Sequence, residues 1–301
     1  MPSNTITFGI TTASEQGRIC ALAAKGHRDL QRCVAAYPSL FPAPPVDGAM
    51  LGSLAASTAF LAPWCTAHQL RVATRASLWV TAEDWQIDSV AMSMESVNAT
   101  VSSCVAVADG AAPAADDPLG RFLAEIRTEL ATVPAFADLR VLWRDEVSNM
   151  LTADAREWEW RAARAAGETQ VPTLAEYIAN ADNYGATFVN VSHWIATGAE
   201  DTLTHLPALI AASREVQQVI RLVNDLASYD RDLASGDLNA LLLGADRDDI
   251  DRLVAEGSER CRSLLEALEG TCPREAAYLA RELGFTGGFY HGADFWGTVE
   301  R

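Results

Sequence analysis

The sequence has no stretch that predicts a membrane span or a secretory signal. No uncharged apolar run reaches the roughly 20 residues that a membrane-spanning helix needs. The N-terminal MPSNTITFGI lacks the charged segment and long apolar core of a signal peptide. From these absences we expect a soluble chain with no membrane span.

Cysteine patterns that bind metal or form a disulfide framework are also missing. The 6 cysteines form no C-x-x-C pair, and no histidine stands at zinc spacing from them. A chain of 301 residues with so few cysteines does not need disulfides to fold. We therefore expect buried reduced thiols, which favour a cytoplasmic location.

Basic residues are scarce. The chain has 23 Lys+Arg against 40 Asp+Glu, a formal net charge of -17. A field of that sign repels nucleic acid, so we expect no nucleic-acid partner. An acidic chain can still bind an anionic ligand where metal cations or a local basic cluster reverse the field.

Patterns typical of β-strands are absent, and helical periodicity replaces them. We find no alternating β-branched run bounded by turns, whereas apolar residues recur at helical spacing in segments of about 12 to 30 residues. We predict a flexible lead over residues 1–14 and one all-α domain over residues 15–301, a helical bundle with a central apolar pocket. The predicted helices cover residues 15–36, 49–61, 63–94, 97–108, 118–130, 134–166, 174–194 with a break at Gly185, 207–233, 246–268 and 273 onward.

One predicted helix carries a column of polar side chains. In IRLVNDLASYDRD (residues 220–232), Asn224, Ser228 and Asp232 recur every four residues. On a helix they stay within roughly 80° of each other over roughly 12 Å of axis. Three oxygen donors in one column suit Mg²⁺, although ordinary hydrogen-bonded polar residues at a helix end remain the alternative.

A second acidic cluster lies in LWVTAEDWQIDSV. Asp84 and Asp88 stand four residues apart, and Glu83 precedes them. Carboxylates at that spacing repel each other by a few tenths of a kcal/mol on a bare helix. They are therefore either spread in solvent or held together by cations.

Together these two stretches resemble the metal-binding motifs of class I terpene cyclases. NDLASYDRDLASGD is similar to the motif (N/D)D-x-x-(S/T)-x-x-x-(E/D), with Asp232 where most members have glutamate. EDWQID is similar to the aspartate-rich motif D-D-x-x-x-D, with Glu83 in its first position. The resemblance covers roughly residue 60 to the end. It implies that Mg²⁺, as three ions with bound diphosphate or with Mn²⁺ as a substitute, is held by Asp84, Asp88, Asn224, Ser228 and Asp232.

Two further stretches resemble the same family and also depart from it. EYIANADNYG (residues 176–185) lacks the diphosphate-sensing arginine that many microbial members carry, and is closer to kaurene-synthase-like and other labdane-related diterpene enzymes. GADFWGTVER resembles the C-terminal G-N-x-x-W-S...R-Y segment, without the tyrosine. The resemblance implies that Arg231 and Arg301 bind the diphosphate.

The chemistry that the resemblance implies is ionisation of an allylic prenyl diphosphate followed by carbocation cyclisation. The similarity of EYIANADNYG to diterpene enzymes favours a C20 substrate, geranylgeranyl or copalyl-type diphosphate. Aromatic faces can stabilise a desolvated cation, although core packing is the alternative role for each. The aromatic candidates for the pocket are Trp85, Tyr177, Tyr184, Phe188, Trp194, Tyr229, Phe289, Tyr290 and Trp296.

Three other readings stay open from the sequence. One is a sesquiterpene cyclase that acts on farnesyl diphosphate. Another is a chain-elongating prenyltransferase, which would normally show two D-D-x-x-D motifs. The third is a non-catalytic helical protein that binds isoprenoids. Because members of the resembled family often pair, the chain could also form a homodimer.

Overall fold

The computed structural model describes residues 10–44, 46–167 and 172–297 of the chain. Within these residues the secondary structure is entirely helical, as predicted. Among them, no helix is both long and apolar enough to cross a lipid bilayer. The elements are α1 (Ile10–Ala36), α2 (Gly48–Leu61), α3 (Ala67–Trp85), η1 (Gln86–Val90), α4 (Met94–Asp109), α5 (Pro118–Leu130), α6 (Phe136–Ala165), α7 (Leu174–Ala179), η2 (Ala181–Tyr184), α8 (Ala186–Thr197), α9 (Glu200–Thr204), α10 (Leu206–Ser235), η3 (Ala240–Leu243), α11 (Arg247–Leu268) and α12 (Pro273–Tyr290).

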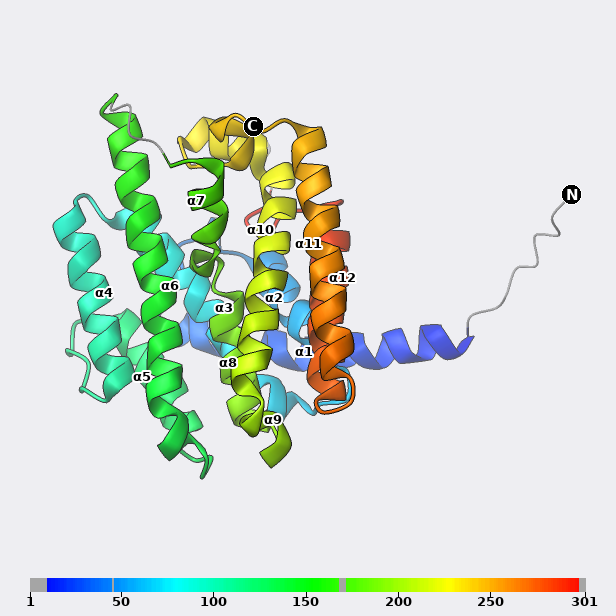
Figure 1. Ribbon diagram of the computed structural model, residues 1–301. Coiled ribbons are helices and arrows are strands. Elements are labelled where there is room, and N and C mark those ends of the chain that lie inside the picture. The colour runs from blue at the N-terminus through cyan, green and yellow to red at the C-terminus, as the bar shows by residue number, and fades with distance from the viewer. Residues whose placement is uncertain (1–9, 45, 168–171, 298–301) are drawn as a thin grey trace, which may run out of the picture.

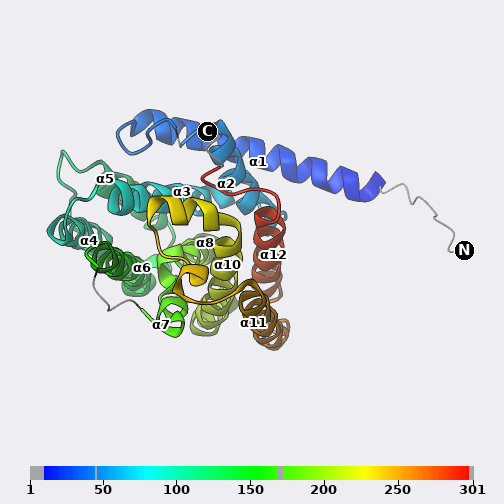
Figure 2. The same ribbon diagram turned by 90° about the horizontal axis from the view of Figure 1, so that it is seen from above.

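The helices form one bundle. In Figure 1, α6, α8 and α10 run side by side, with α4 beyond α6 and with α11 and α12 beside α10. Helix α1 crosses the bundle and packs on α2 and α3. Its N-terminal part extends away from the other helices in both views (Figures 1 and 2). This helix begins at Ile10, five residues before the predicted start at residue 15.

Local sequence signals explain where several helices begin and end. Capping boxes start α3 at Thr66 and α7 at Thr173, and each satisfies two backbone N–H groups that a helix start leaves free. Asp117 caps α5, whose first residue is Pro118. Gly236, at φ 84°, ends α10 in the left-handed conformation that glycine adopts without strain.

Two predicted helices are interrupted. The predicted helix over residues 63–94 is α3 followed by the π-helical turn η1, which closes with a hydrogen bond from the Ala91 N–H to the Gln86 carbonyl. The predicted helix over residues 174–194 is divided into α7, η2 and α8 around Gly185. Gly185 has φ 73°, and a Cβ atom there would come within 2.7 Å of Val80 Cγ1. The break therefore combines a positive φ with a close approach of α8 to α3.

A cluster of aromatic side chains joins α3, α6 and α8. The ring of Phe188 lies 5.6 Å from that of Trp79 and 5.9 Å from that of Trp143. The indole N–H of Trp79 donates to the Leu119 carbonyl at 3.0 Å, and that of Trp143 donates to Ser192 Oγ at 2.8 Å. These contacts bury large side chains with their polar atoms satisfied. They fix the three helices on which much of the site is built.

Candidate active site

The bundle encloses a cavity of about 480 Å³. Its walls come from α2, α3, η1, α6, α7, η2, α8, α10, α12 and the segments that follow α10 and α12. One end is acidic, because it lies at the C-terminal ends of α3 and α10, where Asp84 and Asp232 stand. Earlier turns of the same helices and α2 contribute mainly apolar and hydroxyl side chains, among them Leu54, Leu61 and Val80. The cavity therefore joins an acidic end to a more apolar one.

The first predicted metal motif lies on the wall of this cavity. Asp84 is in the last turn of α3 and Asp88 is in η1, and both side chains line the cavity. The π-helical turn shifts Asp88 away from the direction that a continuous α-helix would give it. Burial raises the pKa of Asp84 to about 7, and nearby Asp237 contributes to the shift. Glu83 does not line the cavity: it is buried next to Asp154, and burial together with Asp84 raises its pKa.

An arginine that the sequence did not single out joins the two acidic stretches. Arg161 Nη1, on α6, lies 3.2 Å from Asp88 Oδ1 and 2.7 Å from Asp237 Oδ1. Its Nη2 also donates to the Asp88 carbonyl at 3.1 Å. Asp237 follows α10 directly, so Arg161 ties the end of one motif to the end of the other. The sequence contained a signal for it, the basic residue four positions after Glu157 in EWEWR.

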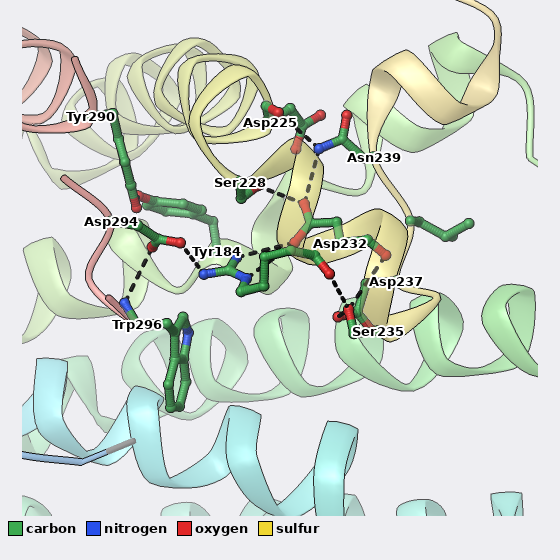
Figure 3. Close-up of polar contacts among 12 residues, drawn as sticks. Tyr184, Asp225, Ser228, Asp232, Ser235, Asp237, Asn239, Tyr290, Asp294 and Trp296 are labelled. Carbon is green, nitrogen blue, oxygen red and sulfur yellow. Dashed lines mark hydrogen bonds and ion pairs between the residues drawn. The ribbon is translucent and has the colours of Figure 1, made fainter. Parts of the chain in front are cut away.

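The second predicted motif lies on α10. Asn224 and Asp232 line the cavity, whereas Ser228 is buried behind Asp232. Ser228 Oγ donates to Asp232 Oδ2 at 2.5 Å, and Asn239 Nδ2 donates to the same oxygen at 2.9 Å. Figure 3 shows Ser228, Asp232 and Asn239 converging from α10 and the loop after it. Burial raises the pKa of Asp232, and these two hydrogen bonds oppose the shift.

Asp225, beside Asn224 in the motif, has a structural role. Its carboxylate accepts hydrogen bonds from the Tyr177 hydroxyl at 3.0 Å and from the Ala240 N–H at 3.0 Å. Asn239 Nδ2 also donates to the Asp225 carbonyl at 2.8 Å. These bonds fold residues 238–240 back on α10, and so they place Asn239 against Asp232.

A second arginine missed by sequence reasoning lines the cavity. Arg221 is one turn before Asn224 on α10 and is buried. Its guanidinium lies 3.8 Å from the centre of the Tyr177 ring and donates to Asn183 Oδ1 at 2.5 Å. It also forms an ion pair with Glu157 at 2.5 Å. It therefore places a cation beside η2, in the region where the sequence lacks the arginine that many microbial members carry.

The segment after α12 returns to the acidic end of the cavity. Asp294 forms an ion pair with Arg231, which also contacts Asp232 Oδ1 at 3.2 Å (Figure 3). The ring of Trp296 lies 6.2 Å from that of Trp85, and both line the cavity. Arg231 is thus held between two carboxylates. Arg301, the other predicted diphosphate ligand, lies outside the described residues.

The aromatic candidates divide into two groups. Trp85, Tyr177, Tyr184, Tyr290 and Trp296 line the cavity, and the Tyr184 and Tyr290 hydroxyls are 2.6 Å apart. Four other candidates are not among the lining residues: Phe188, Trp194, Tyr229 and Phe289.

The prediction that Phe188 and Trp194 face the pocket is therefore corrected. Phe188 packs between two tryptophans of the core, and the ring of Trp194 lies 6.2 Å from that of Tyr278. Ala186 and Val189 face the cavity from α8 instead. The reason is the close contact of α8 with α3 and α6, which directs its large aromatic residues into the core. Tyr229 and Phe289 likewise contribute no surface to the cavity wall.

The donors at the acidic end fit Mg²⁺. They are carboxylate and amide oxygens, the ligands that hard divalent cations prefer, and the acidic side chains there outnumber the arginines. Among the described residues, no three acidic, histidine or cysteine side chains are grouped closely enough to hold a metal by themselves. Such a donor set fits an ion that takes its remaining ligands from water or a substrate phosphate.

Comparison with known proteins agrees with this geometry. Residues 77–252, more than half of the chain, match terpene synthase family 2, C-terminal metal binding. The chain is 28% identical over 281 residues to ent-pimara-9(11),15-diene synthase of Streptomyces sp. (strain KO-3988), across 92% of this chain and 93% of the relative.

Solved structures share the fold. The linalool/nerolidol synthase of Streptomyces clavuligerus, in complex with 2-fluorogeranyl diphosphate, has a TM-score of 0.69 at 18% identity over 90% of this chain and 94% of its own. The 2-methylisoborneol synthase of Streptomyces coelicolor A3(2), in complex with Mg²⁺ and 2-fluorogeranyl diphosphate, has a TM-score of 0.67 at 18% identity over 92% and 91%. The matched region holds both sets of oxygen donors that line the cavity. The chain therefore belongs to terpene synthase family 2 and is a class I terpene cyclase, a lyase that acts on diphosphates.

Proposed function

We propose that this enzyme is a diterpene cyclase that ionises a C20 allylic diphosphate, geranylgeranyl or copalyl-type, and cyclises the resulting carbocation. The observation that carries the C20 assignment is the similarity, over nearly the full length of both chains, to a synthase of an ent-pimaradiene. The stretch EYIANADNYG (residues 176–185), which resembles the corresponding stretch of labdane-related diterpene enzymes, supports the same assignment.

In this proposal the two acidic walls bind the metal and the arginines bind the leaving group. Asp84 and Asp88 are ligands from α3 and η1, and Asn224, Ser228 and Asp232 are ligands from α10. Ser228 would exchange its hydrogen bond to Asp232 for the ion. When bound, Mg²⁺ supplies Lewis-acid stabilisation of the departing diphosphate. Three ions fit the resemblance, and Mn²⁺ can replace Mg²⁺.

Two arginines of α10 complete the diphosphate site in this proposal. Arg221 and Arg231 line the cavity at its acidic end, on the same helix as Asn224. Guanidinium groups bind phosphate oxygens through paired N–H donors. Arg231 must leave Asp294 to do so, whereas Arg221 already points into the cavity from a fixed position on Tyr177 and Asn183.

The remaining lining residues protect and stabilise the cation. Trp85, Tyr177, Tyr184 and Trp296 present aromatic faces, each of which can contribute roughly 1–2 kcal/mol to a desolvated cation. Residues 295–297 line the acidic end and help to exclude water.

A sesquiterpene cyclase acting on farnesyl diphosphate is the second candidate. It is favoured by the structural similarity to a synthase whose name includes nerolidol. The prenyltransferase and non-catalytic readings are not carried forward, because the chain belongs to a terpene synthase family.

A substrate panel separates the two candidates. The protein is incubated with geranylgeranyl, copalyl-type and farnesyl diphosphate, each with Mg²⁺ or with a chelator, and extracts are analysed by gas chromatography and mass spectrometry. We expect cyclic C20 products from one of the C20 substrates, and none without metal. Efficient conversion of farnesyl diphosphate alone would instead assign the enzyme to the sesquiterpene cyclases.

A further inference from the structure

Helix α12 presents a line of polar side chains to the cavity. Tyr278, Glu282, Thr286 and Tyr290 follow one another every four residues, and all four line the cavity wall. Tyr290 is at the acidic end, where its hydroxyl meets that of Tyr184. Glu282 stands two turns earlier, roughly 12 Å back along the helix axis. It is the acidic side chain that α12 contributes to the cavity, on the side away from Asp84 and Asp232.

Glu282 is held in a fixed orientation by one neighbour. Asn190 Nδ2 donates to Glu282 Oε2 at 2.8 Å. Asn190 is itself fixed, because it accepts from the Tyr278 hydroxyl at 2.9 Å and its Nδ2 reaches Ser213 Oγ at 3.0 Å. Within the part of the chain that the structure describes, the bond from Asn190 is the hydrogen bond that Glu282 makes, and it uses Oε2 and not Oε1. One carboxyl oxygen is therefore anchored and the other is free to act in the cavity.

Among the described residues, no arginine or lysine is one of the groups that shift the pKa of Glu282. Burial raises its pKa to about 8, and only the Asn190 hydrogen bond opposes that shift. The titratable groups that face it are Tyr184, Cys261 and Tyr278, whose pKa values are all raised by burial, so they are neutral near pH 7. The acids at the other end of the cavity differ, because arginines stand beside them. An acid left without such a partner in a buried site calls for an explanation.

We propose that Glu282 is the proton acceptor that ends the carbocation chemistry. In this step the C–H bond next to the cationic carbon breaks, its electron pair becomes the new C=C bond, and the proton passes to Oε1 of the Glu282 carboxylate. With a pKa of about 8 the resting carboxyl is protonated near pH 7. Positive charge in the cavity lowers that pKa, the resting proton leaves to solvent, and the ionised carboxylate is then the acceptor. The proposal rests on the cyclase activity and not on the length of the substrate.

The position of Glu282 gives it a role that the diphosphate does not have. The diphosphate site lies at the acidic end, two helical turns away, so a proton lost near Glu282 comes from a different part of the hydrocarbon. Tyr278 and Thr286 flank Glu282 on the same face, but a phenol and an alcohol are much weaker bases than a carboxylate. Glu282 therefore selects which alkene is formed.

The first test is the product spectrum of Glu282→Gln, which keeps the size of the side chain and an oxygen for Asn190. Wild type and variant are incubated with Mg²⁺ and the prenyl diphosphate that wild type converts. We expect diphosphate release within about fivefold of wild type, while the share of the main alkene falls at least tenfold in favour of other products. The matched control is Glu275→Gln, because Glu275 is on the same helix and bonds to Thr202 outside the cavity. An unchanged product spectrum in Glu282→Gln overturns the proposal.

The second test needs no turnover. A prenyl trimethylammonium salt, a permanent cation with a terpenoid tail, is titrated into the protein by calorimetry at pH 7 in two buffers of different ionisation enthalpy. Wild type should release more protons on binding than Glu282→Gln, because the carboxyls at the acidic end are the same in both proteins and Glu282 adds its own proton, and Glu282→Gln should bind at least tenfold more weakly. Equal affinity and equal proton release in the two proteins contradict the proposal. Failure of the C20 assignment in the substrate panel would leave this result unaffected.

Discussion

The guanidinium of Arg221 lies 3.8 Å from the centre of the Tyr177 ring, so that α10 and α7 meet through a cation and an aromatic face inside the cavity wall. The same guanidinium donates to the Asn180 carbonyl and to Asn183 Oδ1, at 3.2 and 2.5 Å, where the chain leaves α7 for η2. A diphosphate that binds Arg221 would therefore also affect the position of the helix break at Gly185, between η2 and α8.

Replacing Arg221 with lysine tests this connection. Lysine keeps the charge but loses the planar fork that stacks on Tyr177 and reaches two acceptors at once. We expect kcat/KM for the prenyl diphosphate to fall about 100-fold, which is about 2.7 kcal/mol of transition-state stabilisation. Arg260→Lys is the matched control, because Arg260 pairs with Glu215 on the exposed surface. Similar kinetics in the two variants would show that the fork of Arg221 is not needed.

Arg161→Gln tests whether the arginine competes with the metal. Its guanidinium forms ion pairs with the carboxylates of Asp88 and Asp237. Its removal should therefore strengthen Mg²⁺ binding in the absence of diphosphate. The expected gain is about two- to fivefold in Kd, since partly exposed ion pairs contribute at most about 1 kcal/mol. Tryptophan fluorescence can follow the titration.

The control for that titration is Arg164→Gln. Arg164 is on the same helix and, within the described residues, donates to the Asp237 carbonyl at 3.4 Å and not to a carboxylate, so its loss should leave Mg²⁺ binding unchanged. Weaker Mg²⁺ binding in Arg161→Gln than in wild type would mean that Arg161 organises the carboxylates instead of competing for them.

Asp294→Asn should release Arg231 for the leaving group. The carboxylate of Asp294 now pairs with the guanidinium that the proposed diphosphate site uses. Without that competitor, inorganic pyrophosphate should bind about three- to tenfold more tightly in the presence of Mg²⁺, as measured by calorimetry. Asp251→Asn, on the exposed face of α11, removes the same charge and should have no effect. Weaker pyrophosphate binding in Asp294→Asn would indicate that Asp294 supports closure of the site.

Gly185→Ala tests the close approach of α8 to α3. A Cβ atom at Gly185 would come within 2.9 Å of both Val80 methyl groups and 3.0 Å of Met150 Sδ, and φ is positive. Gly236 also has a positive φ but nothing within 4 Å of such an atom. We expect Gly185→Ala to lower the free energy of unfolding by about 1–3 kcal/mol more than Gly236→Ala does. Equal losses in urea denaturation would mean that only the backbone conformation matters.

The fold and the two rows of oxygen donors on the cavity wall could be predicted because they depend on short-range patterns. Helical periodicity fixes which residues share a face, so the four-residue spacing brought Asn224 and Asp232 to one wall of the cavity. Proline and glycine marked most helix ends. The π-helical turn at Asp88 could not be predicted, because helical periodicity does not distinguish a π-helical turn from an α-helical one.

The rest of the site depends on tertiary contacts. Phe188 faces the core because α8 contacts α3 and α6 closely, a constraint that no local pattern contains. Arg221 and Arg161 were not singled out, because a single arginine on a helix is usually a surface residue. Their partners, Tyr177 and Asp237, come from segments more than 40 residues away in the sequence.

The most direct test of the account is the position of the metal. Crystals grown with Mn²⁺ and inorganic pyrophosphate allow the ions to be located by anomalous scattering. We predict peaks within coordination distance of Asp84 on one wall and of Asn224 and Asp232 on the other, with pyrophosphate oxygens shared between them. Ions bound only to one wall, or only to acidic residues outside the cavity, would contradict the account.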